Sequence, residues 1–461
     1  MKSLRDPDCL LTEGLAAIRQ QFKVPATFPP PVLEAAEAAA RRSPSEHADR
    51  TAMPFVTLDP ATSTDLDQAF TIEAAGSDLL LHYAIADVPW FVADGDALDT
   101  EAWLRGETMY LPDGKAGLYP PVLAEHAASL LPDGPRPCFL FTTRVAPDGA
   151  VRLEGVERAL IRSRAKLAYD SVRAEDVAPQ FDELARRIAA AENARGAARI
   201  DPPEQEVERD AAGHFTLRLR PLVQSEVQNA ALSLATNLAV ADALYAAGTG
   251  LFRVMAGPDA RAVARLRYTA AAFGLSWPGA MPIEQFERSL DPAQPAAQAF
   301  MLAIRKAGDG ASYVPYQPGV KPWHAAMAAT YCHMTAPLRR LADRYVLRAA
   351  HAIANGQPVP LAVNEAFQRL PAVMAKADAR ASQIDRAVID LAETATLAGR
   401  EGETFAAVIT DLGQNGARIQ LCDAPVVARV DAHSVLPGGQ VRVRLDSSDP
   451  IRRELHFTRV S

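Results

Sequence analysis

The chain has few cysteines, few lysines and no excess of positive charge. Its four cysteines, Cys9, Cys138, Cys332 and Cys422, are far apart, so no CxxC pair indicates a zinc site or a disulfide framework. Lysines make up 7 of the 48 basic residues, and the formal net charge is -8. The protein as a whole would therefore not attract a polyanion, so a nucleic-acid surface would have to be a local basic channel.

Long apolar runs are also missing. No run reaches the roughly 18 residues of a membrane span, and the first residues, MKSLRDPDCLLTEG, contain acids where a signal peptide has an apolar core. We therefore expect a cytoplasmic protein with no membrane partner. Its 461 residues, of which 49% are hydrophobic, are enough for one large domain and one or two small ones.

The apolar periodicity divides the chain into regions. Residues 1–50 contain two short helical patterns and a linker, and their length also suits a small helix-turn-helix. Strand patterns follow from residue 55 in FVTLD, AFTIEAA and LLLHYAIADV and again over residues 138–162, and mostly helical patterns run from residue 165 to residue 400. Residues 401–461 contain five short strands, which favour a closed OB-type barrel over another small barrel or a sandwich. The expected fold is α+β, with a large mixed α/β domain over 51–400 before the barrel.

The stretch TLDPATSTDLDQAF, residues 57–70, places three carboxylates in one segment: Asp59, Asp65 and Asp67. A calcium loop of the EF-hand type needs Gly at its sixth position and Glu at its twelfth, where this stretch has Thr64 and Phe70. A solvated acidic turn is the ordinary alternative. However, the acids lie between two expected strands, and carboxylates that converge on one point repel each other unless a cation joins them. Magnesium bound there could act on a phosphodiester.

A second informative stretch is TAPLRRLADRYVLR, residues 335–348. Arg339 and Arg340 follow a proline and begin an expected helix, a place where backbone N–H groups and guanidinium groups bind phosphate well. Taken alone, this pattern is weak and more often marks a surface ion pair. Together with the acidic stretch, it supplies the metal ligands and the phosphate-binding cation of a phosphodiesterase site.

Several ordered motifs resemble the catalytic (RNB) domain of the ribonuclease II/ribonuclease R family over residues 51–400. The acidic stretch is similar to the family's TID-plus-DxDDA motif, and the match continues through YAIADVPWFVADGDALDTEAWLRGETMYLPDG, RAKLAYDSV and YCHMTAPLRRLAD. The final barrel resembles the family's S1-type RNA-binding module. The resemblance implies a processive, hydrolytic 3′-to-5′ exoribonuclease that needs Mg²⁺ or Mn²⁺. It would thread single-stranded RNA into a channel, release nucleoside 5′-monophosphates and act as a monomer.

The resemblance also implies roles for individual residues. Four positions match the acids of the metal site, with Gln68 in the place of the last one: Asp59, Asp65, Asp67 and Gln68. Arg339 matches the arginine on the phosphates, with Arg340 beside it. The RNA would also contact Tyr110, Tyr169 and Asp385, although core packing is the ordinary role of such tyrosines. Base stacking on an aromatic face is worth roughly 1–3 kcal/mol.

This sequence departs from the family's pattern in four places. Gln68 brings no charge to the metal site. Ala230 and Ala231 stand where the family has paired glutamates, and Glu226, one helical turn earlier, could substitute or could be a solvated helix residue. Ile200 stands in place of a phenylalanine that clamps the terminal base. Residues 1–50 leave no room for two cold-shock barrels.

Two further hypotheses follow from these departures. The protein could be a catalytically weakened or inactive RNA-binding member of the same fold, because a neutral amide, an alanine pair and an isoleucine replace residues of the site. The N-terminal helices could bind a protein partner or DNA. Metal-dependent shortening of RNA separates the first hypothesis from an active nuclease.

Overall fold

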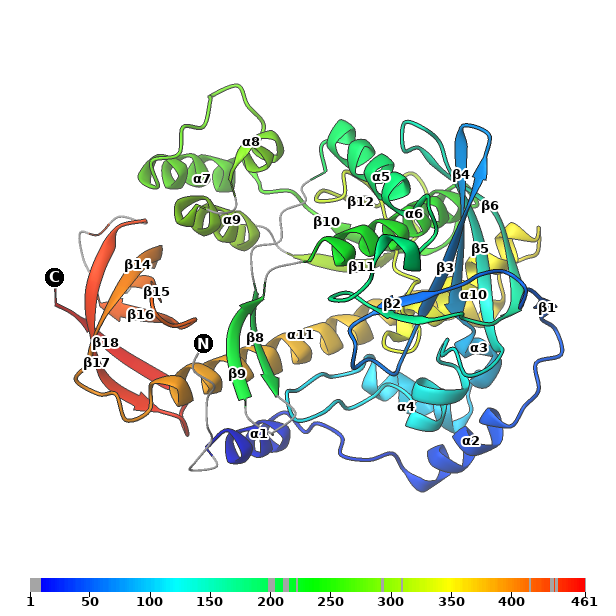
Figure 1. The fold of residues 1–461 in the computed structure, drawn as a ribbon, viewed down its shortest axis with the longest axis horizontal. Coiled ribbons are helices and arrows are strands. Elements are labelled where there is room, and N and C mark those ends of the chain that lie inside the picture. The colour runs from blue at the N-terminus through cyan, green and yellow to red at the C-terminus, as the bar shows by residue number, and fades with distance from the viewer. Residues whose placement is uncertain are drawn as a thin grey trace.

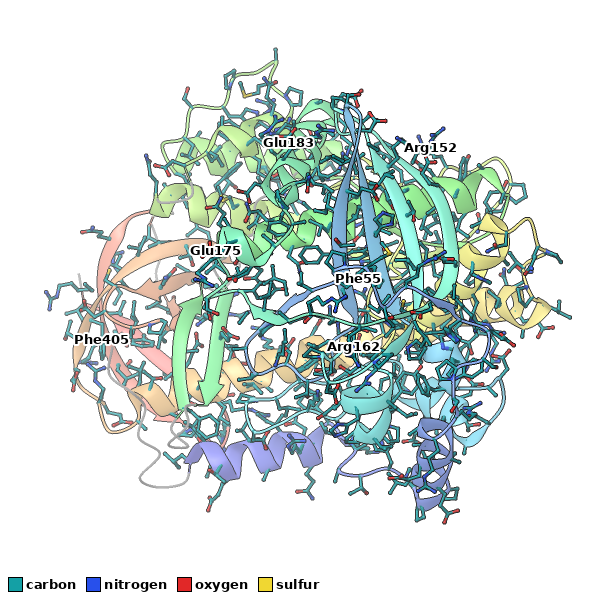
Figure 2. All side chains as sticks on the ribbon, turned by 45° about the vertical axis from the view of Figure 1, so that its right-hand side comes forward. Phe55, Arg152, Arg162, Glu175, Glu183 and Phe405 are labelled. Carbon is teal, nitrogen blue, oxygen red and sulfur yellow. The ribbon has the colours of Figure 1, made fainter. Side chains whose placement is uncertain are left out.

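A computed structural model describes residues 10–197, 204–209, 215–220, 223–291, 294–307, 310–413, 416–431, 435 and 438–460. Within them, the molecule has a broad body of mixed helices and sheets and a β-barrel at one end (Figure 1). No helix in these ranges is both long and apolar enough to cross a membrane. Charged side chains such as Arg152 and Glu183 lie on the outside of the body, and Phe405 lies in the barrel (Figure 2).

A five-stranded sheet forms the centre of the body. Its order is β1 (Ala48–Asp49), β6 (Val151–Ile161), β5 (Arg136–Val145), β4 (Asp78–Ala86) and β3 (Gln68–Ala75). All neighbours pair antiparallel except β1 and β6. The strand patterns expected in AFTIEAA, in LLLHYAIADV and over residues 138–162 are therefore confirmed as β3, β4, β5 and β6.

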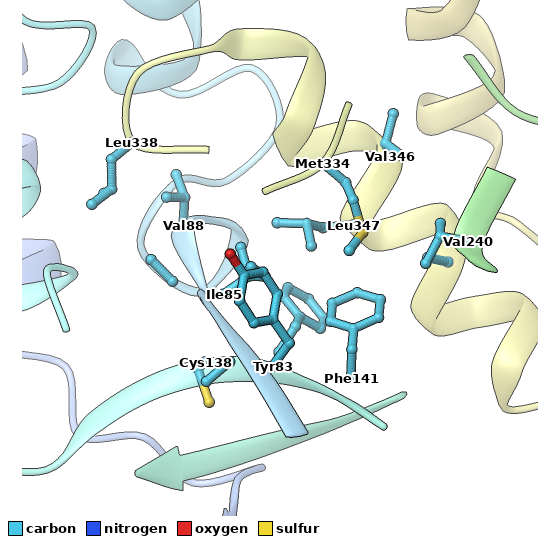
Figure 3. Packing of buried hydrophobic residues seen from close by; sticks show 14 of the residues in the cluster. Tyr83, Ile85, Val88, Cys138, Phe141, Val240, Met334, Leu338, Val346 and Leu347 are labelled. Carbon is cyan, nitrogen blue, oxygen red and sulfur yellow. The ribbon is translucent and has the colours of Figure 1, made fainter. Parts of the chain in front are cut away.

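Two helices, α6 (Gln224–Ala246) and α10 (Leu341–Ala354), pack against this sheet. Figure 3 shows side chains of β4, α6 and α10 meeting in one cluster, among them Tyr83, Ile85, Val240 and Leu347. All four are fully buried. Burying one large apolar side chain contributes about 1.5–3 kcal/mol, so this contact fixes the residues before α10 relative to the strands.

Shorter elements complete the body around the sheet. The helices are α3 (Val88–Phe91), α4 (Ala97–Arg105), η1 (Leu123–Ala127), η2 (Ala174–Asp176) and α5 (Phe181–Arg195). A two-stranded parallel pair joins β2 (Thr57–Asp59) to β7 (Lys166–Ala168). The helix expected from FDELARRIAAAENARGAA is α5.

A second sheet and three helices lie beyond α6. The sheet order is β11 (Ala311–Pro315), β10 (Leu251–Met255), β12 (Trp323–His324) and β13 (Ala329–Thr330). The helices are α7 (Ala260–Ala272), α8 (Ile283–Ser289) and α9 (Pro295–Ala307). They have a small core of their own, in which Trp277 stacks on Phe286 with ring centroids 4.9 Å apart.

The helix α11 (Leu361–Leu397) connects the body to the barrel and continues through Pro371. It contacts α10 and β11 in the body and β17 and β18 in the barrel. The hairpin of β8 (Glu204–Arg209) and β9 (Phe215–Arg220) packs beside α11. Gln205 Nε2 in this hairpin donates to Glu393 Oε1 of α11 (2.6 Å) and to the Pro425 carbonyl of the barrel (2.8 Å).

The barrel is closed and has five strands, as expected for an OB-type fold. Its order is β14 (Thr404–Gly413), β15 (Gly416–Leu421), β16 (Val427–Asp431), β18 (Glu454–Arg459) and β17 (Gln440–Asp449), with β17 paired back to β14. Alternate residues of these strands point inward and form a separate buried cluster.

The two N-terminal helices, α1 (Leu10–Gln21) and α2 (Pro30–Ala40), pack on different parts of the body. Leu11, Leu15 and Ile18 of α1 are buried against α11, whereas α2 packs against α4 and η1. Figure 1 shows α1 below α11 and α2 at the other end of the body. Because the apolar face of each helix is already covered by the body, the two do not form a helix-turn-helix.

Candidate active site

One pocket of about 770 Å³ collects most of the residues that the sequence singles out. Its wall includes Asp59, Asp65, Asp67, Gln68, Tyr110, Tyr169, Glu226, Ala230, Arg339 and Arg340. These residues come from segments nearly 300 positions apart, from the acidic loop to the start of α10. The fold therefore brings the two informative stretches of the sequence together.

Strand pairing positions Asp59 and Tyr169. Asp59 is the last residue of β2 and lies opposite Ala168 of β7, so that the Tyr169 N–H donates to the Asp59 carbonyl at 3.3 Å. Asn229 of α6 holds the same corner, because its Nδ2 donates to the Tyr169 hydroxyl (3.1 Å) and to the Leu58 carbonyl (3.2 Å). No motif in the sequence pointed to Asn229, which lies on a helix that lines the pocket.

Asp67 and Arg339 face each other directly. Asp67 Oδ1 accepts from the Leu338 N–H at 2.7 Å, and Asp67 Oδ2 accepts from Arg339 Nε at 3.2 Å. The Arg339 side chain remains 47% exposed, whereas that of Asp67 is 5% exposed. The guanidinium group can therefore contact a molecule in the pocket while Asp67 holds it in place.

Burial controls the protonation of two of the aspartates. It raises the pKa of Asp67 to about 7, helped by the carboxylates of Asp65 and Asp343 and opposed by Arg339 and the Leu338 N–H. It raises the pKa of Asp59 to about 6, where Arg339 and Lys166 oppose and Asp65 adds to the rise. The nearby cations only partly offset this burial, and a bound divalent cation would favour the ionised form of both carboxylates.

The three aspartates offer hard oxygen ligands, which suit Mg²⁺ or Mn²⁺. They do not converge as the sequence suggested: across the described ranges, no group of three or more His, Cys, Asp or Glu side chains is arranged to hold a metal ion. The protein's own cations contact two of them. Arg339 contacts Asp67, and Lys115 Nζ lies 2.9 Å from Asp65 Oδ1. Lys115 is a site residue that the sequence did not reveal.

Tyr110 lies at the rim of the pocket. Its ring is 50% exposed, and its hydroxyl donates to Asp65 Oδ2 at 3.3 Å. The loop that carries it begins at Gly106, which has φ of 76°, and a Cβ there would lie 2.8 Å from the Ala377 side chain of α11. Half-exposure fits a contact with a ligand better than core packing. Tyr169, in contrast, is partly buried against the main core.

Gln68 has a structural role that the sequence did not predict. Its Nε2 donates to the Thr335 carbonyl at 2.6 Å, and its Oε1 accepts from the Tyr83 hydroxyl at 2.7 Å. The amide thus joins β3 and β4 to the segment before α10. A carboxylate could not donate to Thr335, so an amide suits this position better than an acid. Metal binding by Gln68 remains a prediction.

The other predicted residues lie in different surroundings. Arg340 lines the pocket, but its guanidinium pairs with the fully buried Asp343 at 2.8 Å, at the start of α10. Asp385 lies away from the acidic loop, beside a separate hollow with Glu107, Arg253 and Asp378. Ile200 is outside the described residues. The contacts of Arg340 and Asp385 with RNA therefore remain predictions.

Comparisons with known proteins agree with this architecture. The family description "RNB domain" matches residues 48–356, and "RNase II-type exonuclease C-terminal S1 domain" matches residues 403–460. "Ribonuclease R" of Aquifex aeolicus is 26% identical over 438 residues, which cover 88% of this chain and 61% of that protein. "Exoribonuclease 2" of Cronobacter sakazakii is 28% identical over 415 residues, covering 83% of this chain and 62% of that protein.

The same fold occurs in solved structures. Mycoplasma genitalium RNase R, solved in complex with ribose-methylated single-stranded RNA, aligns with a TM-score of 0.87 and 19% identity. The alignment covers 100% of this chain and 79% of that chain. The chain spans about three-fifths of the length of the two curated relatives. Because the RNB description matches well over half of its residues, this chain belongs to the RNB family.

Proposed function

We propose that this protein is a metal-dependent, hydrolytic exoribonuclease that shortens single-stranded RNA from its 3′ end and releases nucleoside 5′-monophosphates. One observation carries the proposal beyond family membership. Asp67 and Arg339 face each other in a pocket that also exposes Asp59, Asp65 and Tyr110. Carboxylates and a half-exposed guanidinium group in one pocket suit a phosphodiester, which needs both metal ligands and a cation for its oxygens.

Asp59, Asp65 and Asp67 would hold Mg²⁺ or Mn²⁺, which would lower the pKa of a bound water and offset charge on the phosphate. The protein's own groups do the rest. Arg339 donates to the phosphate oxygens as negative charge grows on them, and the Leu338 N–H and Arg339 orient the Asp67 carboxyl group. The pocket walls limit the access of bulk water and so strengthen each of these interactions.

Tyr110 and the barrel would hold the RNA. The half-exposed Tyr110 ring can stack on a base, with its hydroxyl fixed by Asp65. Stacking of this kind tolerates any base. The five-stranded barrel belongs to a class that grips the backbone of single strands, which gives salt-sensitive binding with little sequence preference. We also propose that the protein acts as a cytoplasmic monomer, as its resemblance to the family implies.

The test uses a 5′-labelled single-stranded RNA of about 20 nucleotides, incubated with Mg²⁺ or Mn²⁺ and compared with an Asp67→Asn control. We expect a ladder that shortens from the 3′ end and that is absent without metal and in the control. A 3′-phosphate on the product instead of a 5′-monophosphate would contradict hydrolysis in the proposed direction.

A second candidate function is RNA binding without cleavage. The observation in its favour is Gln68, whose amide is hydrogen bonded to Tyr83 and Thr335 and supplies no charge to the acidic loop. Ala230, which also lines the pocket, supplies none either. Intact RNA in the cleavage assay, together with a shift of the same RNA in a binding gel, would favour this function over the first.

A further inference from the structure

Asp65 lies in the wall between two hollows. It lines the active-site pocket and also a smaller hollow of about 290 Å³, where Lys115 and Glu125 lie beside it. Lys115 Nζ is 2.9 Å from Asp65 Oδ1 and 3.1 Å from Glu125 Oε1. Glu125 is further fixed by the Thr64 hydroxyl, which donates to its Oε2 at 3.1 Å. One ammonium group is therefore shared between a predicted metal ligand and a second carboxylate outside the pocket.

We propose that Lys115 is a resident counter-ion of Asp65, which competes with the divalent cation for that carboxylate, and that Glu125 keeps the ammonium when Asp65 releases it. This inference rests on the proposed function, because it concerns the binding of the metal. It assigns roles to two residues outside the acidic loop.

The charges around the loop explain why a counter-ion is needed. Asp59, Asp65 and Asp67 all line the active-site pocket. Ionised carboxylates that share one pocket repel each other unless a cation lies beside them. Arg339 offsets the charge of Asp67, and Lys115 offsets that of Asp65. The loop is thereby stable before any metal binds, but Asp65 is not available to join a ligand set.

A lysine side chain suits a counter-ion that must release the Asp65 carboxylate when metal binds. An ammonium group is a compact charge on a flexible stem, with three donors that can bond two carboxylates at once. The Lys115 side chain is 23% exposed, so water can replace the Asp65 oxygen when the contact opens. With Glu125 as its second partner, the ammonium is not left unpaired. Lysine is also scarce in this protein, which otherwise uses arginine for most of its positive charge.

The position of Lys115 links metal binding to the base-binding rim. Lys115 and Tyr110 belong to one loop, residues 109–116, closed by backbone hydrogen bonds of 3.0 and 2.8 Å between Met109 and Ala116. Both side chains contact the same carboxylate, because the Tyr110 hydroxyl donates to the other oxygen of Asp65. Replacement of Lys115 by a divalent cation at Asp65 would therefore also alter the contacts of the loop that carries Tyr110.

A purely structural ion pair predicts a different outcome. If Lys115 only held the loop together, its removal would disorder Asp65 and weaken metal binding. A competing counter-ion predicts tighter binding in its absence. Removal of Lys115 and removal of Glu125 should change the metal affinity in opposite directions. Loss of Glu125 would leave the ammonium group to Asp65 alone and so weaken metal binding.

The experiment measures Mn²⁺ binding to the full-length protein without RNA, by electron paramagnetic resonance of the free ion. We expect Lys115→Met to bind Mn²⁺ about 3- to 10-fold more tightly than the wild type, the range set by a partly buried ion pair. We expect Glu125→Gln to bind it several-fold more weakly. We expect Lys115→Arg also to bind it more weakly than the wild type, because a guanidinium group can hold the Asp65 carboxylate bidentately and releases it less readily. Lys321→Met, which removes the same charge where it lies over the Trp323 ring, serves as the charge-matched control.

The outcomes separate the two proposals. If the wild type binds Mn²⁺ and Lys115→Met binds it equally or more weakly, the role of Lys115 is wrong and the proposed function still stands. A wild type that binds no Mn²⁺ and trims no RNA contradicts the proposed function, and the inference with it. Melting curves in the absence of metal verify that each variant is folded. Because Glu125→Gln leaves Lys115 in place, it tests the inference even if Lys115→Met unfolds.

Discussion

Arg19 of the N-terminal helix α1 holds Asp113 with two hydrogen bonds. Its Nε donates to Asp113 Oδ2 at 2.9 Å and its Nη2 to Asp113 Oδ1 at 2.8 Å, and the same Nη2 donates to the Gly114 carbonyl at 2.8 Å. Asp113 and Gly114 form the tip of the loop that carries Tyr110 and Lys115. The helix at the start of the chain is thus a support for the active-site rim.

This contact predicts the effect of Arg19→Ala. The loop at residues 109–116 would lose its three hydrogen bonds to α1, and we expect RNA trimming to slow by about 3- to 10-fold, since a bidentate, partly exposed pair contributes on the order of 1 kcal/mol. The exchanged pair Arg19→Asp with Asp113→Arg should recover part of the rate. Arg41→Ala, which removes an exposed pair on α2, is the control. Equal rates for Arg19→Ala and the wild type would show that the support is unnecessary.

The adjacent arginines Arg339 and Arg340 should differ sharply. Arg339→Ala removes the half-exposed guanidinium and should lower the trimming rate by about 10²–10³, the usual effect of losing one charge-stabilising donor. The loss of thermal stability should be smaller than for Arg340→Ala, because Asp67 keeps the Leu338 N–H and its raised pKa lets it take up a proton. Arg340→Ala leaves the buried Asp343 without its cation and should destabilise the fold by about 3 kcal/mol. Rates and melting temperatures of both variants check this division. A stable Arg340→Ala protein would contradict the structural role.

Gln68→Asp restores the acid typical of the family and tests the amide. The shorter side chain cannot reach both Thr335 and Tyr83, so buried polar groups lose partners, at a cost of about 1–3 kcal/mol. We expect a lower melting temperature without metal and a larger rise on adding Mn²⁺ than in the wild type. Tyr83→Phe, which removes one hydrogen bond without adding charge, is the comparison. Unchanged stability of the metal-free variant would show that the amide contacts are dispensable.

The raised pKa of Glu393, at the junction of body and barrel, predicts that the free energy of unfolding depends on pH. Burial raises its pKa from 4.5 to about 7, against the opposing Val427 and Gln205 donors. The folded protein therefore binds this proton more tightly than the unfolded chain does. The resulting stabilisation of the fold is fully present below pH 4.5 and is lost as the pH rises to about 7. The change is at most about 3 kcal/mol.

Glu393→Gln should flatten this dependence. Melting temperatures between pH 5 and pH 8 measure it as the difference between variant and wild type, which cancels the titration of other buried acids. Glu365→Gln, an exposed residue of the same helix, is the matched control. A difference that does not change with pH would mean that Glu393 keeps its charge throughout.

Local patterns in the sequence were enough to predict much of this architecture. Strand alternation identified β3 to β6, helical spacing identified α5, α6 and α11, and the turn-separated strands after residue 400 identified the barrel. The acidic loop was placed correctly between strands, because Asp59 ends β2 and Gln68 begins β3. These features depend on neighbours along the chain, which a sequence displays directly.

The features that sequence reasoning missed depend on distant contacts. Gln68 meets Thr335 across 267 positions, and Lys115 reaches Asp65 from a loop with no motif of its own. The hairpin of β8 and β9 lies in a region whose pattern suggested helices, and its buried Phe215 and Leu217 face α1 and α11. Only the tertiary structure brings these residues into contact, so composition and periodicity do not reveal them.

The unbroken helix α11 sets how the barrel can move. Its 37 residues span about 55 Å, and the first barrel strand begins at Thr404, close behind its end at Leu397. The barrel is therefore mounted on a stiff arm and keeps a constant distance from the acidic loop. An RNA that contacts both the barrel and the acidic loop must span that distance. The affinity of the protein for single-stranded RNA should therefore drop sharply once the RNA is too short to span it.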